Sequence, residues 1–280
     1  MTDMLSARVR ALELPMTIEM SKKSRELAAK GVDVISLSLG EPDFDTPEFI
    51  KNAGIEGIRE NYSHYMPVPG YADLREAIAK KFKRDNNLEY STDQIVVSTG
   101  AKQTLANLML SLIEPGDEVL VPAPYWVSYV GMIKFCEGTP NIIETTVESG
   151  YKITPEQLDA AITPKTRLMV FSSPNNPSGA MYTREEFEAL AAVLRKHPHV
   201  FVIADEIYEH INFTKQGHTS MAQFDDMFDR TITINGVSKA FAMTGWRIGY
   251  IGAPEKIARA CNKMQGQVTS GANCIAQRAV

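Results

Sequence analysis

The sequence contains little cysteine: only Cys136, Cys261 and Cys274 occur among its 280 residues. They form no CxxC pair, and their odd number argues against a disulfide framework or a zinc site built from thiolates. The histidines also lack metal-ligand spacing, and Glu209-His210 does not extend to an HExxH motif. We therefore expect no metal site, and a reducing compartment such as the cytoplasm.

Several other features are missing. The first residues, MTDMLSARVRALELPM, lack the apolar core and small-residue cleavage site of a signal peptide, and no later run is long enough to cross a bilayer. The net charge of -5, without a dense basic cluster, argues against nucleic acid or an acidic membrane surface as a partner. No GxGxxG or GxxxxGKS/T motif is present, so a nucleotide-binding protein is not expected.

What the sequence does have is a regular alternation of helical patterns and short apolar runs, which is typical of α/β architecture. Helices are expected over residues 18–30, 73–85, 102–113, 185–196 and 270–280. Strands are expected over residues 32–39, 94–98, 118–121, 167–171, 200–204, 231–235 and 248–251. Continuous apolar strands between helices indicate a largely parallel, buried sheet. Because ligands of such sheets sit beyond the carboxyl ends of the strands, the polar residues that follow the strands are the candidates for chemistry.

Three strand ends carry such residues: SPNNPSG at 173–179, ADEIY at 204–208, and NGVSK at 235–239 with GWR at 245–247. Each segment alone also has an ordinary interpretation, as a turn, a helix N-cap or a surface lysine. Together they supply an amine for a Schiff base, a carboxylate for a pyridine nitrogen, donors for a phenolic oxygen and a phosphate cradle. Those are the parts of a pyridoxal 5'-phosphate (PLP) site.

Seven segments of the chain also resemble a known family. They are SLSLGEPDFDTP, VPGYADLREAIA, STGAKQTLANL, PAPYWVSY, SSPNNPSG, ADEIYEHI and NGVSKAFAMTGWRIGY. In this order they resemble class I aminotransferases of PLP fold type I, most closely the bacterial aspartate aminotransferases. The resemblance implies an α/β fold with a mostly parallel central sheet flanked by helices, plus a partial small domain. It implies an N-terminal arm and small-domain segment in residues 1–44, and a large PLP-binding domain in residues 45–280.

The resemblance implies a role for each residue around the cofactor ring. Lys239 matches the Schiff-base lysine, which also moves the proton between the substrate Cα and the cofactor. Asp205 matches the carboxylate that pairs with the pyridine nitrogen. Tyr208 and Asn176 match the pair that hydrogen-bonds the phenolic oxygen, and Trp126 matches the aromatic plate stacked on the ring.

The phosphate group has a matching set of its own. The resemblance implies that the backbone of Gly100, Ala101 and Lys102 binds the phosphate together with Ser238 and Arg247. The residue pattern agrees, because Thr99-Gly100-Ala101 falls where a strand meets a helix N-terminus. 

The substrate contacts follow from the same resemblance. Gly40 matches the glycine whose backbone touches the substrate carboxylate, and Trp126 and Asn176 also border the substrate. The side chain of Lys102 matches a ligand of the distal carboxylate of a dicarboxylic substrate, with Thr17 as a further candidate for that end.

The resemblance also implies a homodimer with shared active sites, because Tyr65 matches a tyrosine that reaches the phosphate in the neighbouring subunit. Family members are longer, and their C-terminal part completes the small domain and supplies the arginine that binds the substrate α-carboxylate. Neither Arg259 nor Arg278 lies in the matching motif, so that role is assigned to no residue. The sequence is therefore interpreted as C-terminally truncated.

The implied function is PLP-dependent transfer of an amino group between an amino acid, with aspartate as the first candidate, and a 2-oxo acid such as 2-oxoglutarate. Such a transfer predicts ping-pong kinetics. Two alternatives stay open. One is a PLP-dependent carbon–sulfur lyase, which would release pyruvate and ammonia without an acceptor. The other is a truncated cofactor-binding remnant with little activity.

Overall fold

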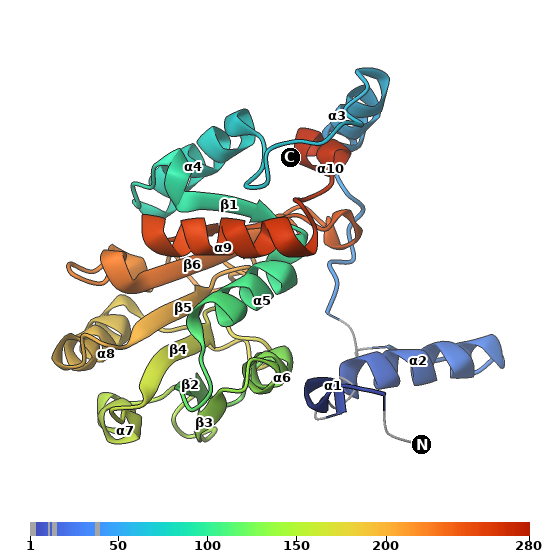
Figure 1. Cartoon of the computed structure of the whole chain (residues 1–280). Coiled ribbons are helices and arrows are strands. Elements are labelled where there is room, and N and C mark those ends of the chain that lie inside the picture. The colour runs from blue at the N-terminus through green and yellow to red at the C-terminus, as the bar shows by residue number, and fades with distance from the viewer. Residues whose placement is uncertain (1–3, 11, 13–15, 37–39) are drawn as a thin grey trace.

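The computed structural model describes residues 4–10, 12, 16–36 and 40–280, which form a seven-stranded sheet with helices on both faces (Figure 1). The strands, in chain order, are β1 (Ile95–Ser98), β2 (Glu118–Pro122), β3 (Thr139–Ile143), β4 (Thr166–Ser172), β5 (Phe201–Asp205), β6 (Thr231–Gly236) and β7 (Gly249–Gly252). Their order across the sheet is β1-β7-β6-β5-β4-β2-β3. Only β7 is antiparallel to its neighbours, so the expected mostly parallel sheet is confirmed.

Alternating side chains along each strand divide the core into two layers. Val96 and Ile203 pack on one face, beneath α5 (Gly100–Leu112), α6 (Ser128–Phe135) and α9 (Glu255–Val268). Val97 and Val202 pack on the other face, beneath α4 (Ala72–Asn86), α7 (Pro155–Ala161) and α8 (Arg184–Lys196). This period-two burial on both faces is what the continuous apolar strands predict.

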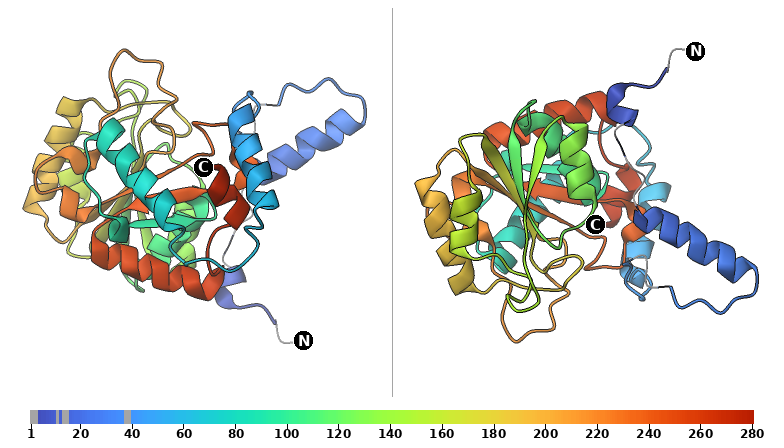
Figure 2. Two further views of the ribbon diagram at one scale, coloured as in Figure 1. Left: turned by 90° about the horizontal axis from the view of Figure 1, so that it is seen from above. Right: turned by 90° about the horizontal axis from the view of Figure 1, so that it is seen from below.

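The remaining helices lie around this three-layer body. They are α1 (Ala7–Arg10), α2 (Met16–Ala29), α3 (Glu48–Arg59), α10 (Cys274–Ala279) and the short 3-10 helices η1 (Thr92–Gln94), η2 (Met221–Gln223), η3 (Phe228–Arg230) and η4 (Thr244–Trp246). Helix α3 packs against α10 at one end of the sheet, and α2 projects away from the body in every view (Figure 2). Within the described chain, no helix has the length and apolarity that a bilayer span needs.

Helix boundaries follow local hydrogen bonding. Helix α8 begins with a capping box, in which the Thr183 hydroxyl accepts from the Glu186 amide at 3.2 Å and the Glu186 carboxylate accepts from the Thr183 amide at 2.7 Å. Helix α4 ends at Asn87, whose φ of 51° lies in the left-handed region. Because such signals are local, the sequence places these helices to within about two residues.

Two expected elements differ from the structure. The strand expected over 32–39 is wrong for residues 32–36, where Ile35 is 86% exposed and no strand forms; residues 37–39 lie outside the described part. An apolar run does not make a strand unless a neighbouring strand pairs with it. The helix expected over 270–280 begins only at Cys274, because Ser270 and Gly271 have φ values of 58° and 134°. The division at residue 44 into two domains stays a prediction.

Candidate active site

Six strand ends and one strand start meet along one edge of the sheet. Since β7 is antiparallel to both β1 and β6, those two strands run in the same direction as β5, β4, β2 and β3. The register pairs both Ser98 and Gly236 with Gly249, so the segments after β1 and β6 lie beside the residue that precedes β7. We call this edge the rim. It brings Gly100, Lys239 and Arg247 near one another although they are far apart in sequence.

Asp205 ends β5, and its side chain lies on the α6 side of the sheet. The residue is only 6% exposed, and its carboxylate accepts a hydrogen bond from the Tyr129 hydroxyl at 2.8 Å and one from the Ile207 amide at 3.3 Å. Burial raises the pKa of Asp205 to about 6, and the Tyr129 hydrogen bond opposes that rise. A buried carboxylate with unused acceptor capacity is suited to bind a cationic N–H group.

Asn176 and Tyr208 face each other across the rim, from the segments after β4 and β5. The Asn176 amide donates to the Tyr208 hydroxyl at 3.1 Å, and the Asn176 backbone N–H donates to the Ser172 hydroxyl at 3.1 Å. Burial raises the pKa of Tyr208, and the charge of Asp205 raises it further. The structure therefore brings together the two residues that the sequence predicted as partners of a phenolic oxygen.

Lys239 lies three residues beyond β6. Its amine donates to the carbonyl of Gly40 and lies 5.6 Å from the centroid of the Tyr208 ring. Partial burial lowers the pKa of Lys239, and the charge of Arg247 acts in the same direction against the opposing effect of Glu41. A lysine of lowered pKa is a better nucleophile near neutral pH, as a Schiff-base lysine must be.

The predicted phosphate cradle is closely packed. Gly100 has a φ of 79°, and a Cβ there would overlap the guanidinium of Arg247. A Cβ at Gly249 would likewise overlap the backbone of Ala101. Arg247, itself at a φ of 60°, is held by a hydrogen bond from Nη1 to the Thr244 carbonyl at 2.8 Å. The guanidinium thus lies directly at the N-terminus of α5, where backbone N–H groups and positive charge favour an anion.

The other predicted residues border the same rim. Trp126 is half-buried, packs edge-on against Tyr129 with ring centroids 5.6 Å apart, and has the Lys102 amine 4.9 Å from its ring centroid. Partial burial lowers the pKa of Lys102, and the positive charge of Arg247 adds to this effect. Ser238, next to the lysine, is 7% exposed.

Tyr65 and Thr17 stand apart from this group. Tyr65 is 97% exposed and lines a separate hollow of about 390 Å³, together with His64, Met66 and residues 269–274. Its exposure leaves it free to contact another molecule, and its predicted role in a neighbouring subunit stays a prediction. The side chain of Thr17 lies outside the described residues.

Tyr129 and Ser172 belong to the site but were not among the predicted residues. Tyr129 is 1% exposed and supplies the side-chain hydrogen bond to Asp205, while Ser172 supports Asn176. The spacing of Trp126 and Tyr129 was the available signal, because residues three apart at the start of a helix share one face.

Comparison with known proteins identifies the family of the chain. The family model "Aminotransferase class I and II" matches residues 32–280. The chain belongs to this family. Class I aminotransferases depend on PLP, so the family and cofactor expected from the sequence are confirmed.

Two relatives show how much of the aminotransferase is present. The aspartate/prephenate aminotransferase of Nitrosomonas europaea is 49% identical over 274 residues, which are 98% of this chain and 69% of that protein. The bifunctional aspartate aminotransferase and glutamate/aspartate-prephenate aminotransferase of Petunia hybrida is 48% identical over 98% of this chain and 57% of its own length. The chain therefore spans between 57% and 69% of the length of these relatives.

Solved aminotransferase structures have the same fold. The aspartate aminotransferase of Thermus thermophilus with maleate superimposes with a TM-score of 0.96 at 42% identity, over 99% of this chain and 72% of that one. The enzyme of Rhizobium meliloti gives a TM-score of 0.95 at 42% identity, over 99% and 70% of the two chains. The fold type I architecture predicted from the sequence is thus confirmed.

The residues along the rim fit PLP. Asp205 offers a carboxylate beside the buried Tyr129, and Asn176 and Tyr208 form a polar pair beside the Lys239 amine. The glycine at position 100 leaves room for the Arg247 guanidinium at a helix N-terminus. These groups match a pyridine nitrogen, a phenolic oxygen, an aldehyde and a phosphate respectively.

Proposed function

We propose that this chain transfers an amino group from an amino acid, aspartate first, to a 2-oxo acid such as 2-oxoglutarate, with PLP held by Lys239. The observation that best supports the proposal is the buried carboxylate of Asp205 on the same rim as the Lys239 amine. When bound, PLP supplies an electron sink for the negative charge that develops at the substrate Cα.

The residues of the chain then have separate tasks. Lys239 would hold the cofactor through its amine, and the same amine, once free, takes the proton from the substrate Cα and returns it later. Asp205 would keep the cofactor's ring nitrogen protonated, and Tyr129 orients that carboxylate. The Asn176–Tyr208 pair would hold the phenolic oxygen, and Arg247 with the N-terminus of α5 would fix the phosphate.

A dicarboxylic substrate is supported by the names of the relatives and by two residues of this chain. The names of these relatives include aspartate, and some also include prephenate. Prephenate is therefore the second acceptor to test. The Lys102 amine beside Trp126 would bind the distal carboxylate, and the Gly40 backbone beside Lys239 would contact the nearer one. 

A homodimer with shared sites is part of the same proposal. Tyr65 is 97% exposed, and α3 carries three further exposed apolar residues, Phe49 at 70%, Ile55 at 45% and Ile58 at 61%. An apolar surface of this kind is typical of a contact between subunits. In the dimer, Tyr65 would reach the phosphate held by the partner subunit.

Replacing Lys239 with Ala tests the cofactor assignment. The chain with PLP should show the visible absorbance of PLP linked to a lysine, and Lys239→Ala should lose it. Lys256→Ala, an exposed lysine on α9, is the matched control and should keep it. An unchanged spectrum in Lys239→Ala would refute the assignment.

Addition of aspartate to the PLP-loaded chain tests the activity. We expect the visible band to disappear and oxaloacetate to form, and 2-oxoglutarate to restore the band. Removal of the Lys239 base should slow this half-reaction by about 100- to 10,000-fold. Release of pyruvate and ammonia without an acceptor would favour the carbon–sulfur lyase instead, and a stable band with every amino acid would favour a cofactor-binding remnant.

A further inference from the structure

A buried ionic cluster lies behind the turn that joins Asp205 to Tyr208. The cluster consists of Lys81 and Asn86 on α4, Glu206 and Glu209 in the turn, and His218; we call it the turn cluster. The two glutamates are only 2% and 6% exposed. Two buried carboxylates within a four-residue segment are costly unless they are paired, so each needs a partner.

Glu209 has the larger set of partners. The Lys81 amine forms an ion pair with its Oε1, the Asn86 amide donates to Oε2 at 2.7 Å, and His210 Nε2 lies 3.0 Å from Oε1. Burial by itself would raise the pKa of Glu209, but the contacts with His210, Lys81 and Asn86 lower it to about 2. Glu209 is therefore a carboxylate held in its charged form by α4 and by the turn itself.

Glu206 is paired on the other side of the turn. His218 Nε2 lies 3.0 Å from its Oε2, and the side chains of the two residues are 8% and 3% exposed. Burial lowers the pKa of His218, but the charge of the nearby Glu206 outweighs this and raises it. The turn cluster thus pairs two negative with two positive groups when His218 is protonated.

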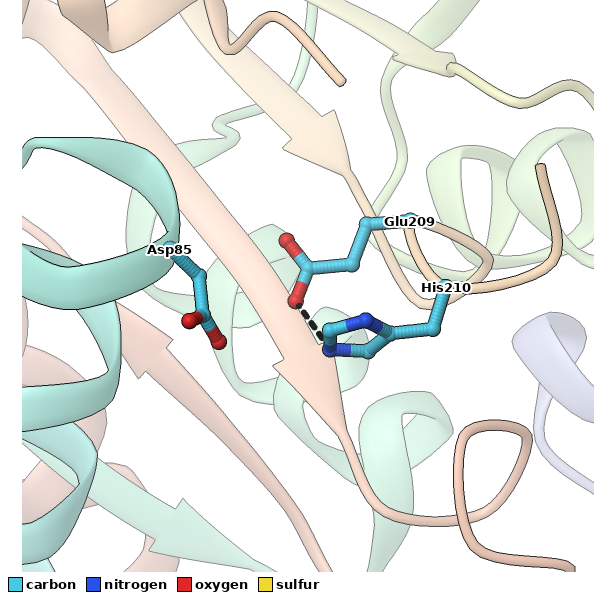
Figure 3. A group of neighbouring side chains, drawn as sticks. All are labelled: Asp85, Glu209 and His210. Atoms are coloured by element: carbon cyan, nitrogen blue, oxygen red, sulfur yellow. Dashed lines mark ion pairs between the residues drawn. The ribbon is translucent and has the colours of Figure 1, made fainter. Parts of the chain in front are cut away.

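Lys81 is the cation of this cluster. Its amine forms an ion pair with Glu209 and also lies 4.0 Å from Asp85 Oδ2. Figure 3 shows Asp85 on α4 facing Glu209 and His210 of the turn, an arrangement of two carboxylates and an imidazole that also suits a metal ion. Because the Lys81 ammonium already pairs with Glu209 and the Arg84 guanidinium with Asp85, we assign the cluster a role in holding the turn instead of a metal-binding role.

The spacing of the turn connects the cluster to the site. Residues 205 and 208 present their side chains to the rim, whereas residues 206 and 209 present theirs to the cluster behind it. The Glu209 amide donates to the Glu206 carbonyl at 3.0 Å, and the Glu206 amide donates to Ile234 of β6 at 2.9 Å. A movement of either glutamate would therefore move Asp205 and Tyr208 as well.

We propose that Glu206 and Glu209 are positioning residues, which hold the turn against α4 and His218 and so place the Asp205 carboxylate and the Tyr208 hydroxyl. The inference rests on the proposed PLP-dependent function, since those two groups are assigned to the cofactor there. Glu209 and Lys81 touch neither substrate nor cofactor in this arrangement. Their effect passes through the backbone of the turn.

The decisive variants change the charge of the turn cluster but keep side chains of about the same size. Glu209→Gln leaves the Lys81 ammonium with only the more distant Asp85 carboxylate, Lys81→Met leaves the Glu209 carboxylate without its ammonium, and the double variant removes both charges. Lys81→Arg keeps the cation and is the conservative rescue. Leu190→Ala, in the core under α8, is the control for a general loss of stability.

Two measurements separate positioning from general stability. The first is the pH titration of the absorbance of PLP linked to Lys239, whose midpoint depends on the Asn176–Tyr208 pair. Glu209→Gln and Lys81→Met should shift this midpoint by about half a unit or more and weaken PLP binding about tenfold. The second is amide hydrogen exchange of residues 206–211 in the apoprotein, which should become about tenfold faster in both single variants.

The outcomes are distinct. Lys81→Arg and the double variant should recover most of the midpoint shift, whereas Leu190→Ala should lower the melting temperature without moving the midpoint. Single variants with a wild-type midpoint and wild-type exchange would overturn the inference, as would an equal shift in Leu190→Ala. If the wild-type chain showed no lysine-linked band, the proposed function would fail, while hydrogen exchange would still decide whether the cluster anchors the turn.

Discussion

Asp205 has to satisfy two opposing requirements. Burial at the end of β5 favours its neutral form and raises its pKa to about 6, whereas its proposed role, binding a protonated ring nitrogen, requires the carboxylate. Before a cation arrives, the charged form is a cost to the folded chain at neutral pH. The site therefore gives up stability for a preorganised charge, as functional sites often do.

Asp205→Asn should make this cost measurable in the apoprotein. The folded pKa of about 6 lies above the ordinary value of 3.8, so folded protein binds more protons, and this residue's contribution to stability falls as the pH rises from about 4 to about 6. A shift of two units corresponds to about 3 kcal/mol. Urea unfolding should show Asp205→Asn gaining stability relative to wild type across this window, with Tyr129 still able to donate to the amide oxygen.

Asp225→Asn is the control for that experiment, because Asp225 is exposed. Its unfolding curve should run parallel to the wild-type curve at every pH. If Asp205→Asn also ran parallel, the carboxylate would not be strained by burial. With PLP added the order should reverse, since only the wild-type residue can pair with the ring nitrogen.

Individual site residues were predictable to different degrees. Lys239, Asp205 and Asn176 lie at or after expected strand ends. Residues at the carboxyl ends of parallel strands lie along one edge of the sheet, which is where ligands bind. Tyr129 and the turn cluster were not predicted, because their roles depend on which helix packs behind which strand. Lys81 in particular reads as one of several charges on a solvated helix until α4 is placed against the turn.

Among the elements, β7 and α5 approach each other closely at Gly249. A Cβ at Gly249 would overlap backbone atoms of Gly100 and Ala101, and backbone cannot move aside as a side chain can. This close approach is what places the N-terminus of α5 beside Arg247. Gly249 is needed because the backbone of α5 leaves no space for a Cβ. Its own backbone φ does not lie in the left-handed region.

Gly249→Ala should therefore displace the start of α5, lower the melting temperature and weaken PLP binding by more than about tenfold. Gly131→Ala is the matched control, because Gly131 lies within α6 with no atom near its hypothetical Cβ. That change should stabilise the chain by about 0.5–1 kcal/mol without altering PLP affinity. Equal PLP affinity in both variants would show that the contact does not shape the phosphate site.

The elements were predictable where the signal was local. Helix α4 ends in a left-handed cap at Asn87, helix α8 begins with a capping box, and the apolar strands are bounded by turn residues. The expected strand over residues 32–36 fails because its apolar side chains have no sheet to join. Local pattern predicts what a segment favours, but pairing decides what forms.

At the scale of the whole molecule, α3 carries an exposed apolar surface that supports the proposed dimer. Phe49 and Ile58 are more than half exposed, and Ile55 is 45% exposed on the same helix. Neither this surface nor the exposed Tyr65 was recognisable from the spacing of apolar residues. An apolar residue in a subunit contact and one in the core give the same helical periodicity in the sequence.

Ile58→Asp should shift the chain from dimer to monomer in sedimentation velocity at micromolar concentration, because a charge would have to be buried between the subunits. Val147→Asp places the same charge at another residue that is 65% exposed, near β3, and should sediment as wild type. Wild-type chain that sediments as a monomer at every concentration would contradict the shared-site proposal, and so would a dimeric Ile58→Asp.

The direction of β7 has a kinetic consequence. The residues proposed to bind PLP span positions 100 to 247, and they meet only after β7 has inserted between β1 and β6 with Ser98 and Gly236 both opposite Gly249. Contacts between such distant parts of a chain form late, because closing a long loop is entropically unfavourable. PLP binding should therefore occur later than chain compaction during refolding. The rate at which bound PLP appears would then report the rate of the last step of sheet assembly.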